Sequence, residues 1–350
     1  MAYEIDYIPV GIGEKGGDAI AIRYGDFSSP TTQNVVVIDG GTKDSGKALV
    51  EHIKIHYGTT YVDLVVASHL HNDHISGLSE VFENLTVGKL VAHCPWDYTK
   101  AIQKMTNMSV TQKGLETRLE KSLSMLSDLV DMATEKGVVV VQPFAGEQVH
   151  DGLYILGPTE EYYQQLLANF GVTPEVKDEH KIEQFIGAVK EAVGWIAEEL
   201  HIETLSDDYL DTSHENNSSL VLLLVVDGKK FLFTGDAGKD ALGRAIDFAE
   251  ANNVSLNKID FLDVPHHGSK RNLGPTILNR LMPVHAFISC PPQGDPKHPS
   301  RKVINALIRR NCNPGSTRNG KTICHPSADA PQRDGWGPLA PETFFNQVDE

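Results

Sequence analysis

The feature that most constrains this chain is a run of six residues, His69-Leu70-His71-Asn72-Asp73-His74. Four of the six side chains offer imidazole nitrogen or carboxylate oxygen, the usual donors to zinc and similar ions. The run follows residues 62–67, a short apolar segment rich in β-branched residues that predicts a fully buried strand. A loop after such a strand can turn all four side chains inward together. The segment therefore predicts a metal site, since chance histidines in a polar loop would rarely have this order.

The size and composition of the chain bound what it can be. It has 350 residues, 40% of them hydrophobic, which is enough to bury a large core. No apolar run is long enough to cross a bilayer, and the first residues lack the basic and apolar regions of a signal peptide. The four cysteines are scattered and form no CxxC pair, which favours a reducing compartment. We expect a cytoplasmic protein.

The charge of the chain is unevenly spread. The formal net charge is -16, which argues against loose, unspecific binding to nucleic acid. Residues 264–325 nevertheless contain ten lysines and arginines and a single acid, Asp295. Basic side chains beside a metal site would favour an anionic substrate such as a phosphodiester. The alternative is that Arg301, Arg309 and Arg310 form the solvated face of a surface helix.

The pattern along the chain predicts strands that lead into a helix in each half. In the first half we expect strands at 5–10, 19–24, 35–39 and 62–67 and a helix at 47–57. In the second half Asp227-Gly228 predicts a hairpin between 220–226 and 230–233, before a helix at 240–251 and a strand at 259–264. Two sheets packed face to face with helices outside would satisfy this layering.

The six-residue run resembles the signature of the metallo-β-lactamase superfamily. One segment before it and two segments after it resemble the other motifs of the superfamily, in the right order. These are VVIDGG at 36–41, FLFTGD at 231–236 and VPHHGS at 264–269. Within the superfamily the chain resembles the hydrolase domain of bacterial competence (ComEC-like) DNA-uptake proteins, and phosphorylcholine-esterase-type phosphodiesterases are similar in layout. That resemblance rests on VPHHGS, on NNSSL at 216–220, on Lys297-His298-Pro299, and on GDAI at 17–20.

The resemblance implies an α/β fold, a four-layer αββα sandwich of the metallo-β-lactamase type. Because the motifs extend from about residue 7 to residue 325, we expect a single domain over residues 1–350. Two helical stretches, at about 98–136 and 160–212, would be insertions, the second including apolar positions from Ile182 to Leu200 at helical spacing. These insertions could form a lid over the pocket or an interface in a homo-oligomer.

The resemblance also implies a site for two divalent metal ions, with zinc expected and manganese as the alternative. One ion would be held by His69 and His71. The other would be held by Asp73, His74 and His266. Asp236 would bridge the two ions. A third histidine on the first ion is less clear. His214 lies close to its expected place but is offset by about one residue, and Glu215 is an alternative.

The implied chemistry is hydrolysis by a hydroxide shared between two metal ions about 3.5–4 Å apart. Asp73 would serve as a ligand and orient the hydroxide, and Asp39 would hold a ligand histidine in the right tautomer. The leaving oxygen must be protonated or neutralised, for which His298, His267 and Lys270 are candidates.

These inferences predict a phosphodiesterase or nuclease acting on an anionic small molecule or a nucleic acid. One alternative is a hydrolase of thioesters or lactones on the same dinuclear site, and another is a non-catalytic metal-binding scaffold. A true β-lactamase is disfavoured because those enzymes replace the bridging aspartate, whereas Asp236 is present.

Overall fold

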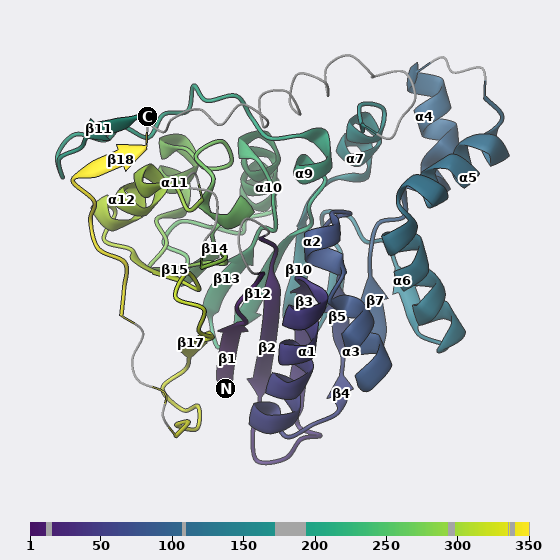
Figure 1. Ribbon diagram of the computed structural model, residues 1–350, viewed down its shortest axis with the longest axis horizontal. Coiled ribbons are helices and arrows are strands. Elements are labelled where there is room, and N and C mark those ends of the chain that lie inside the picture. The colour runs from purple at the N-terminus through teal and green to yellow at the C-terminus, as the bar shows by residue number, and fades with distance from the viewer. Residues whose placement is uncertain are drawn as a thin grey trace.

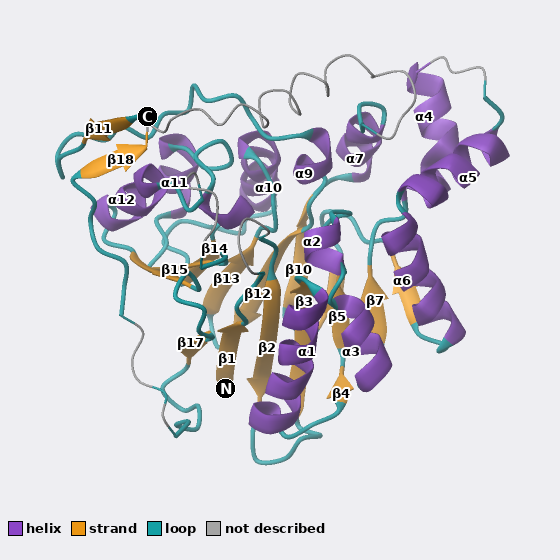
Figure 2. Cartoon of the chain, in the orientation of Figure 1, coloured by secondary structure: helices purple, strands orange, loops and turns teal. Residues whose placement is uncertain are grey.

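The computed structural model describes residues 1–11, 16–106, 110–171, 194–292, 298–334, 336 and 340–349. Within these ranges two seven-stranded sheets pack face to face, with helices over both outer faces (Figures 1 and 2). Three apolar clusters fill the spaces between the layers: one between the sheets, and one between each sheet and its own helices. This is the αββα sandwich that the sequence predicted.

The first sheet has the strand order β17-β1-β2-β3-β5-β7-β8. Its strands are β1 (Ala2–Tyr7), β2 (Ala19–Gly25), β3 (Gln33–Gly40), β5 (Leu64–Val66), β7 (Lys89–Val91), β8 (Val139–Val141) and β17 (Ile323–Pro326). The helices that cover it are α1 (Lys43–His52), which continues as a π-helical turn at Ile53–Tyr57, α3 (Leu78–Asn84) and α6 (Ser124–Glu135).

The second sheet has the order β16-β15-β14-β13-β12-β10-β9. Its strands are β9 (Gln148–His150), β10 (Leu153–Gly157), β12 (Val221–Val226), β13 (Lys229–Phe233), β14 (Phe261–Asp263), β15 (His285–Ile288) and β16 (Asn313–Ser316). Its covering helices are α7 (Glu160–Leu167), α10 (Lys239–Ala251), α11 (Pro275–Leu281) and α12 (Arg301–Arg309).

Smaller elements connect these layers. Two-stranded pairs form between β4 (Tyr61–Val62) and β6 (Thr86–Val87), and between β11 (Trp195–Ala197) and β18 (Gln347–Asp349). The short helices are α2 (Asn72–Ile75), α4 (Thr99–Thr106), α5 (Gln112–Ser122) and α9 (His214–Asn217), with 3-10 turns at Pro95–Tyr98 and His266–Gly268. None of the described helices has the length and apolarity needed to cross a bilayer.

The local sequence explains most of these elements. Asp227 and Gly228 adopt positive φ angles of 52° and 75°, the conformation that a two-residue turn between β12 and β13 requires, so the predicted hairpin is confirmed. Strands β2 and β5 of the first sheet are buried along their whole length, which explains why 64–66 within the apolar run 62–67 is continuous rather than alternating.

The two expected helical stretches have different outcomes. The stretch at 98–136 is confirmed, since α4, α5 and α6 fill most of it. The stretch at 160–212 begins with α7, but residues 172–193 lie outside the described residues. Beyond them the helical prediction is wrong: Trp195–Ala197 is a strand and Leu200 lies in a turn. A tertiary contact overrides the local pattern, because Trp195–Ala197 pairs with β18, which is distant in the sequence.

Candidate metal centre

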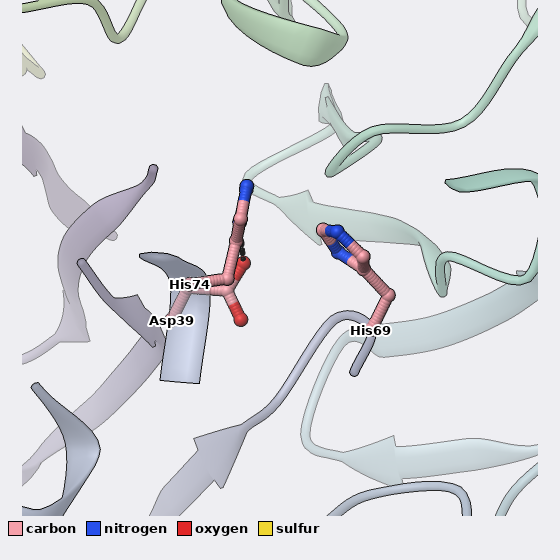
Figure 3. A group of neighbouring side chains, drawn as sticks. All are labelled: Asp39, His69 and His74. Atoms are coloured by element: carbon pink, nitrogen blue, oxygen red, sulfur yellow. Dashed lines mark hydrogen bonds and ion pairs between the residues drawn. The ribbon is translucent and has the colours of Figure 1, made fainter. Parts of the chain in front are cut away.

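The six-residue run occupies the loop that follows β5 and the single turn of α2. Strands β3 and β5 are parallel neighbours, so their carboxyl ends meet at one edge of the first sheet. Asp39, near the end of β3, accepts hydrogen bonds from the Ser68 amide (2.7 Å) and hydroxyl (2.5 Å). Its other contact is with Nδ1 of His74, at 2.7 Å. Figure 3 shows Asp39 beside His74, with His69 projecting from a separate part of the loop.

Two imidazole nitrogens and a carboxylate converge at one end of this centre. Nε2 of His69 lies 3.1 Å from Nδ1 of His71 and 3.6 Å from Oδ2 of Asp236. Burial lowers the pKa of His69 well below its usual value, so the ring is neutral. A neutral imidazole is the form that binds a metal ion, so these three residues are a fitting group for a cation.

A second group lies around His74. Its Nε2 atom is 3.3 Å from Oδ1 of Asp236, and both atoms are buried without a hydrogen-bond partner among the described residues. Burial alone would lower the pKa of His74, but the carboxylates of Asp236 and Asp39 raise it well above its usual value. Buried polar atoms without partners cost free energy, and a cation between them would remove that cost. The donor set therefore fits a metal ion here as well.

Asp236 connects the two groups. It follows β13 in the second sheet, where its amide donates to Oγ of Ser219 at 3.1 Å. Its carboxylate lies within 3.3 to 3.7 Å of nitrogens of His69, His74 and His266. These histidines lower the pKa of Asp236 well below its usual value although burial alone would raise it, so the side chain is ionised.

The two histidines of the VPHHGS segment differ in what they can offer a metal ion. Nδ1 of His266 faces Oδ1 of Asn272 at 3.0 Å, and its Nε2 lies 3.7 Å from Oδ2 of Asp236. His267 lies close to Asp73 and His74, with one ligand atom of each within 4.8 Å of the others. However, its Nδ1 faces the Ser289 carbonyl at 3.0 Å and its Nε2 accepts from the Gly17 amide at 3.2 Å. Only His266 keeps a ring nitrogen directed at the centre.

The Gly17 turn fits tightly between the two halves of the centre. Gly17 has a φ of +118°, and a Cβ at this position would lie 1.8 Å from the carbonyl oxygen of Asp73. No residue with a side chain could make this approach. The neighbouring Asp18 is buried, with its carboxylate 3.8 Å from Nδ1 of His74 and 3.7 Å from Nδ1 of His267.

The remaining predicted residues lie at or beyond the rim. His214 is exposed on α9, and no potential metal-binding group among the described residues includes it. The His298 ring stacks on His266, with 5.5 Å between ring centroids. The Lys270 ammonium lies 3.4 Å from a carboxylate oxygen of Asp349 and 5.1 Å from the ring centre of Tyr209.

The basic stretch is largely neutralised by other parts of the chain. Arg309 forms an ion pair with the buried carboxylate of Glu198, and Arg310 donates to both oxygens of Glu203, at 2.8 and 3.2 Å. Arg301 donates to the Gln347 carbonyl and lies over the ring of Trp195. These arginines therefore form neither a substrate-facing basic surface nor a simple solvated helix face. Their contacts hold residues 195–203 and β18 against α12. Lys297 lies outside the described residues.

Several residues of the centre were not assigned from the sequence. Asp18 belongs to the GDAI segment, but that resemblance alone gave it no role. Ser219 belongs to the NNSSL segment, which gave it no role either, and Asn272 belongs to none of the quoted segments; only the fold brings them to Asp236 and His266. His93 and His150 belong to no potential metal-binding group among the described residues; they face the Pro143 carbonyl (2.7 Å) and Oδ1 of Asn34 (3.0 Å).

Residues 17–110 match the family model described as the metallo-beta-lactamase superfamily. Residues 17–110 thus belong to a metallo-β-lactamase superfamily domain. The chain is similar to ComE operon protein 3 of Bacillus subtilis, with 29% identity over 205 residues that cover 56% of this chain and 26% of that protein. It is also similar to Recombination protein 2 of Haemophilus influenzae, with 38% identity over 116 residues that cover 33% of this chain and 14% of that protein. The chain thus spans about a quarter or less of the length of these relatives.

Among solved structures, the chain is similar to a metal-dependent hydrolase of the β-lactamase superfamily, with a TM-score of 0.46, 12% identity, and coverage of 92% of this chain and 98% of the other. A diphosphatase of the PhnP family gives a TM-score of 0.42 at 10% identity, with coverage of 93% and 99%. The family model and the two competence-related relatives confirm the resemblance that the motifs indicated.

Proposed function

We propose that this metal-dependent hydrolase of the metallo-β-lactamase superfamily cleaves phosphodiester bonds, as a phosphodiesterase or nuclease, through a dinuclear centre. The observation that carries the proposal is the position of Asp236, whose carboxylate lies within 3.3 to 3.7 Å of His69, His74 and His266. A carboxylate in contact with histidines from both groups can bridge two ions.

In this proposal the ligands divide as the resemblance implied: His69 and His71 for one ion, Asp73, His74 and His266 for the other, and Asp236 between them. The ions, zinc or manganese, would supply Lewis acidity and a nucleophile at neutral pH when bound. The chain's own contribution is to orient the rings. Asp39 accepts from Nδ1 of His74, which directs Nε2 of that ring to Asp236.

Asn272 orients the His266 ring in the same way, by a hydrogen bond to Nδ1. The Nδ1–H group of His266 donates to the Asn272 amide oxygen, and Asn272 is held in turn because its amide nitrogen donates to the Asp236 carbonyl at 2.8 Å. His267 has a structural role in this proposal, since its Nδ1–H donates to the Ser289 carbonyl and its Nε2 accepts from the Gly17 amide. Of the three candidates for the proton donor to the leaving oxygen, His298 at the rim is therefore preferred over His267 and Lys270.

Two observations favour a phosphodiester over a thioester or lactone. Two of the six proposed ligands, Asp73 and Asp236, are carboxylates, and oxygen donors suit hard ions such as manganese that are used in phosphoryl chemistry. One of the similar proteins is named for recombination, a process that acts on nucleic acid. The neutralised basic stretch does not add to this support.

The test is a substrate panel on the full chain, stripped of metal with a chelator and reloaded with zinc or manganese. The substrates are bis-p-nitrophenyl phosphate, plasmid DNA, RNA and a thioester. We expect metal-dependent cleavage of a phosphodiester, lost at least about 100-fold in Asp236→Asn. Turnover of the thioester alone would favour the alternative hydrolase. Two bound ions without turnover of any substrate would favour the metal-binding scaffold.

A further inference from the structure

The buried carboxylate of Asp349, in β18, joins two turns at the rim of the candidate metal centre. Strand β18 lies beside α12 (Figure 1). The Ser300 hydroxyl faces both carboxylate oxygens, at 2.9 and 3.0 Å, and the Arg301 amide donates to one of them at 3.0 Å. The Lys270 ammonium lies 3.4 Å from the other oxygen. Asp349 and Ser300 are 3% and 0% exposed, so water does not compete for these contacts.

Each of the two turns carries a histidine of the centre. The first turn contains His266 and the second contains His298. The two rings stack, with 5.5 Å between their centroids. A backbone hydrogen bond from the Ser300 amide to the Gly268 carbonyl, at 3.0 Å, links the turns directly. Asp349 adds side-chain contacts to both turns, so it helps to set the distance between the two rings.

The charge of Asp349 explains why a carboxylate suits this position. The Lys270 ammonium and the Arg301 amide group are donors only, so they hold the two turns together through an acceptor that lies between them. Asp349 supplies that acceptor. Its negative charge also interacts favourably with the first turn of α12, where the amide groups have no acceptor within the helix. Asparagine would keep one acceptor oxygen without the charge, whereas alanine would lose both.

We propose that Asp349 is a positioning residue, which holds His298, the proposed proton donor to the leaving oxygen, next to the proposed ligand His266. This role rests on the proposed function and deepens it, because Asp349 acts through His298 and not on the substrate. A proton donor works only within hydrogen-bond reach of the oxygen that it protonates. A displacement of about 1 Å can lower a rate by about 100-fold. Loss of Asp349 should therefore slow those reactions whose leaving oxygen needs a proton.

The test compares two phosphodiesters that differ in leaving group, with the metal-loaded full chain. The p-nitrophenolate group leaves bis-p-nitrophenyl phosphate without a proton, whereas the sugar oxygen of a thymidine dinucleotide must be protonated as it leaves. In Asp349→Ala we expect kcat for the dinucleotide to fall about 10- to 100-fold and kcat for the nitrophenyl ester to stay within about threefold. Asp349→Asn should lose less. The ratio of the two kcat values does not depend on the fraction of folded enzyme. The matched control, Asp329→Asn at an exposed position, should change neither value.

A double variant tests whether Asp349 acts through His298. Residues that act through one group have effects that do not add. Introducing Asp349→Ala into His298→Gln should therefore change kcat for the dinucleotide by less than about twofold. Equal losses on the two esters, additive losses in the double variant, or a wild type that cleaves only the nitrophenyl ester would overturn the inference. Faster cleavage by Asp349→Ala would also overturn it, and would make Asp349 a carboxylate that obstructs the substrate.

A measurement without substrate distinguishes this role from the proposed function. In the metal-free chain with isotope-labelled histidine, the ring signals of His298 in nuclear magnetic resonance spectra can be assigned from their loss in His298→Gln. We expect these signals to move in Asp349→Ala and to stay in place in Asp329→Asn. Unmoved signals in Asp349→Ala would overturn the inference even in an active enzyme. A wild type that cleaves neither ester would contradict the proposed function, and the ring signals would still decide whether Asp349 positions His298.

Discussion

Asp39 accepts hydrogen bonds from the backbone and hydroxyl of Ser68 and faces Nδ1 of His74, so one side chain sets both the loop and the tautomer of a proposed ligand. In Asp39→Asn the amide can no longer accept from all three donors. We expect metal affinity to fall by about 10- to 100-fold in a titration of the stripped chain. The matched control is Asp44→Asn, whose side chain is 87% exposed on α1. Equal affinity in the two variants would contradict this role for Asp39.

His93 predicts a specific pH dependence of stability. Its ring is buried between Phe144 and Tyr163, and burial lowers its pKa from 6.5 to about 4. The unfolded chain therefore binds a proton between pH 6.5 and 4 that the folded chain does not. This makes the folded chain lose stability as the pH falls through that window.

The predicted size of this effect is about 2 kcal/mol between pH 7 and pH 5. In His93→Gln the side chain can still donate to the Pro143 carbonyl but cannot titrate, so the loss of stability over the same interval should be smaller by about that amount. Urea unfolding at both pH values, in the presence of a chelator, measures the difference. A variant with the same pH dependence as wild type would show that His93 is not the titrating group.

Single residues of the centre were predictable to different degrees. His69, His71, Asp73 and His74 lie within one short run, so their shared role follows from spacing after a buried strand. Asp236 needed the order of the superfamily motifs to be noticed. Asn272 could not be found in this way, because its role depends on the turn that brings it back to His266.

At the scale of elements, α12 illustrates why charge along a sequence is a poor guide to a binding surface. The sequence shows ten basic residues in one stretch but not which carboxylates they meet. In the structure the guanidinium of Arg309, 10% exposed, pairs with the fully buried carboxylate of Glu198. Its other donors go to the carbonyls of Leu200, Glu199 and Ile202. These contacts predict a structural role.

We therefore expect Arg309→Gln to lower the free energy of unfolding by about 2–4 kcal/mol, because it leaves a buried carboxylate unpaired. The Michaelis constant for a phosphodiester should stay unchanged. Urea unfolding and steady-state kinetics measure the two effects, with the exposed Lys321→Gln as control. The double variant Arg309→Gln/Glu198→Gln should recover part of the stability. A raised Michaelis constant with unchanged stability would restore the basic stretch as a substrate surface.

The predictions of secondary structure failed where a strand pairs with a segment that is far away in the sequence. The hairpin at Asp227-Gly228 was predictable because its turn residues determine it locally. Strand β11 was not, because Trp195–Ala197 pairs with Gln347–Asp349, about 150 residues further along the chain. Apolar residues at helical spacing cannot reveal such a partner.

Over the whole molecule, the centre lies where the two sheets end side by side. His69 and His74 follow β5 of the first sheet, whereas Asp236 and His266 follow β13 and β14 of the second. The sequence predicted the two layers, because each half repeats strands before a helix. It could not predict which loops meet, since that depends on the packing of one sheet on the other. The single domain over 1–350, the cytoplasmic location and a homo-oligomer formed through the helical insertions stay predictions.

The central claim is that residues from both sheets form one dinuclear metal centre. Its most direct test is the metal content of the purified full chain, measured by mass spectrometry after reloading with zinc or manganese and removal of unbound ions. We predict about two ions per chain in wild type and at most one in Asp236→Ala, with the folded state of the variant checked by circular dichroism. Wild type without bound metal, or a folded Asp236→Ala variant that still binds two ions, would contradict the account.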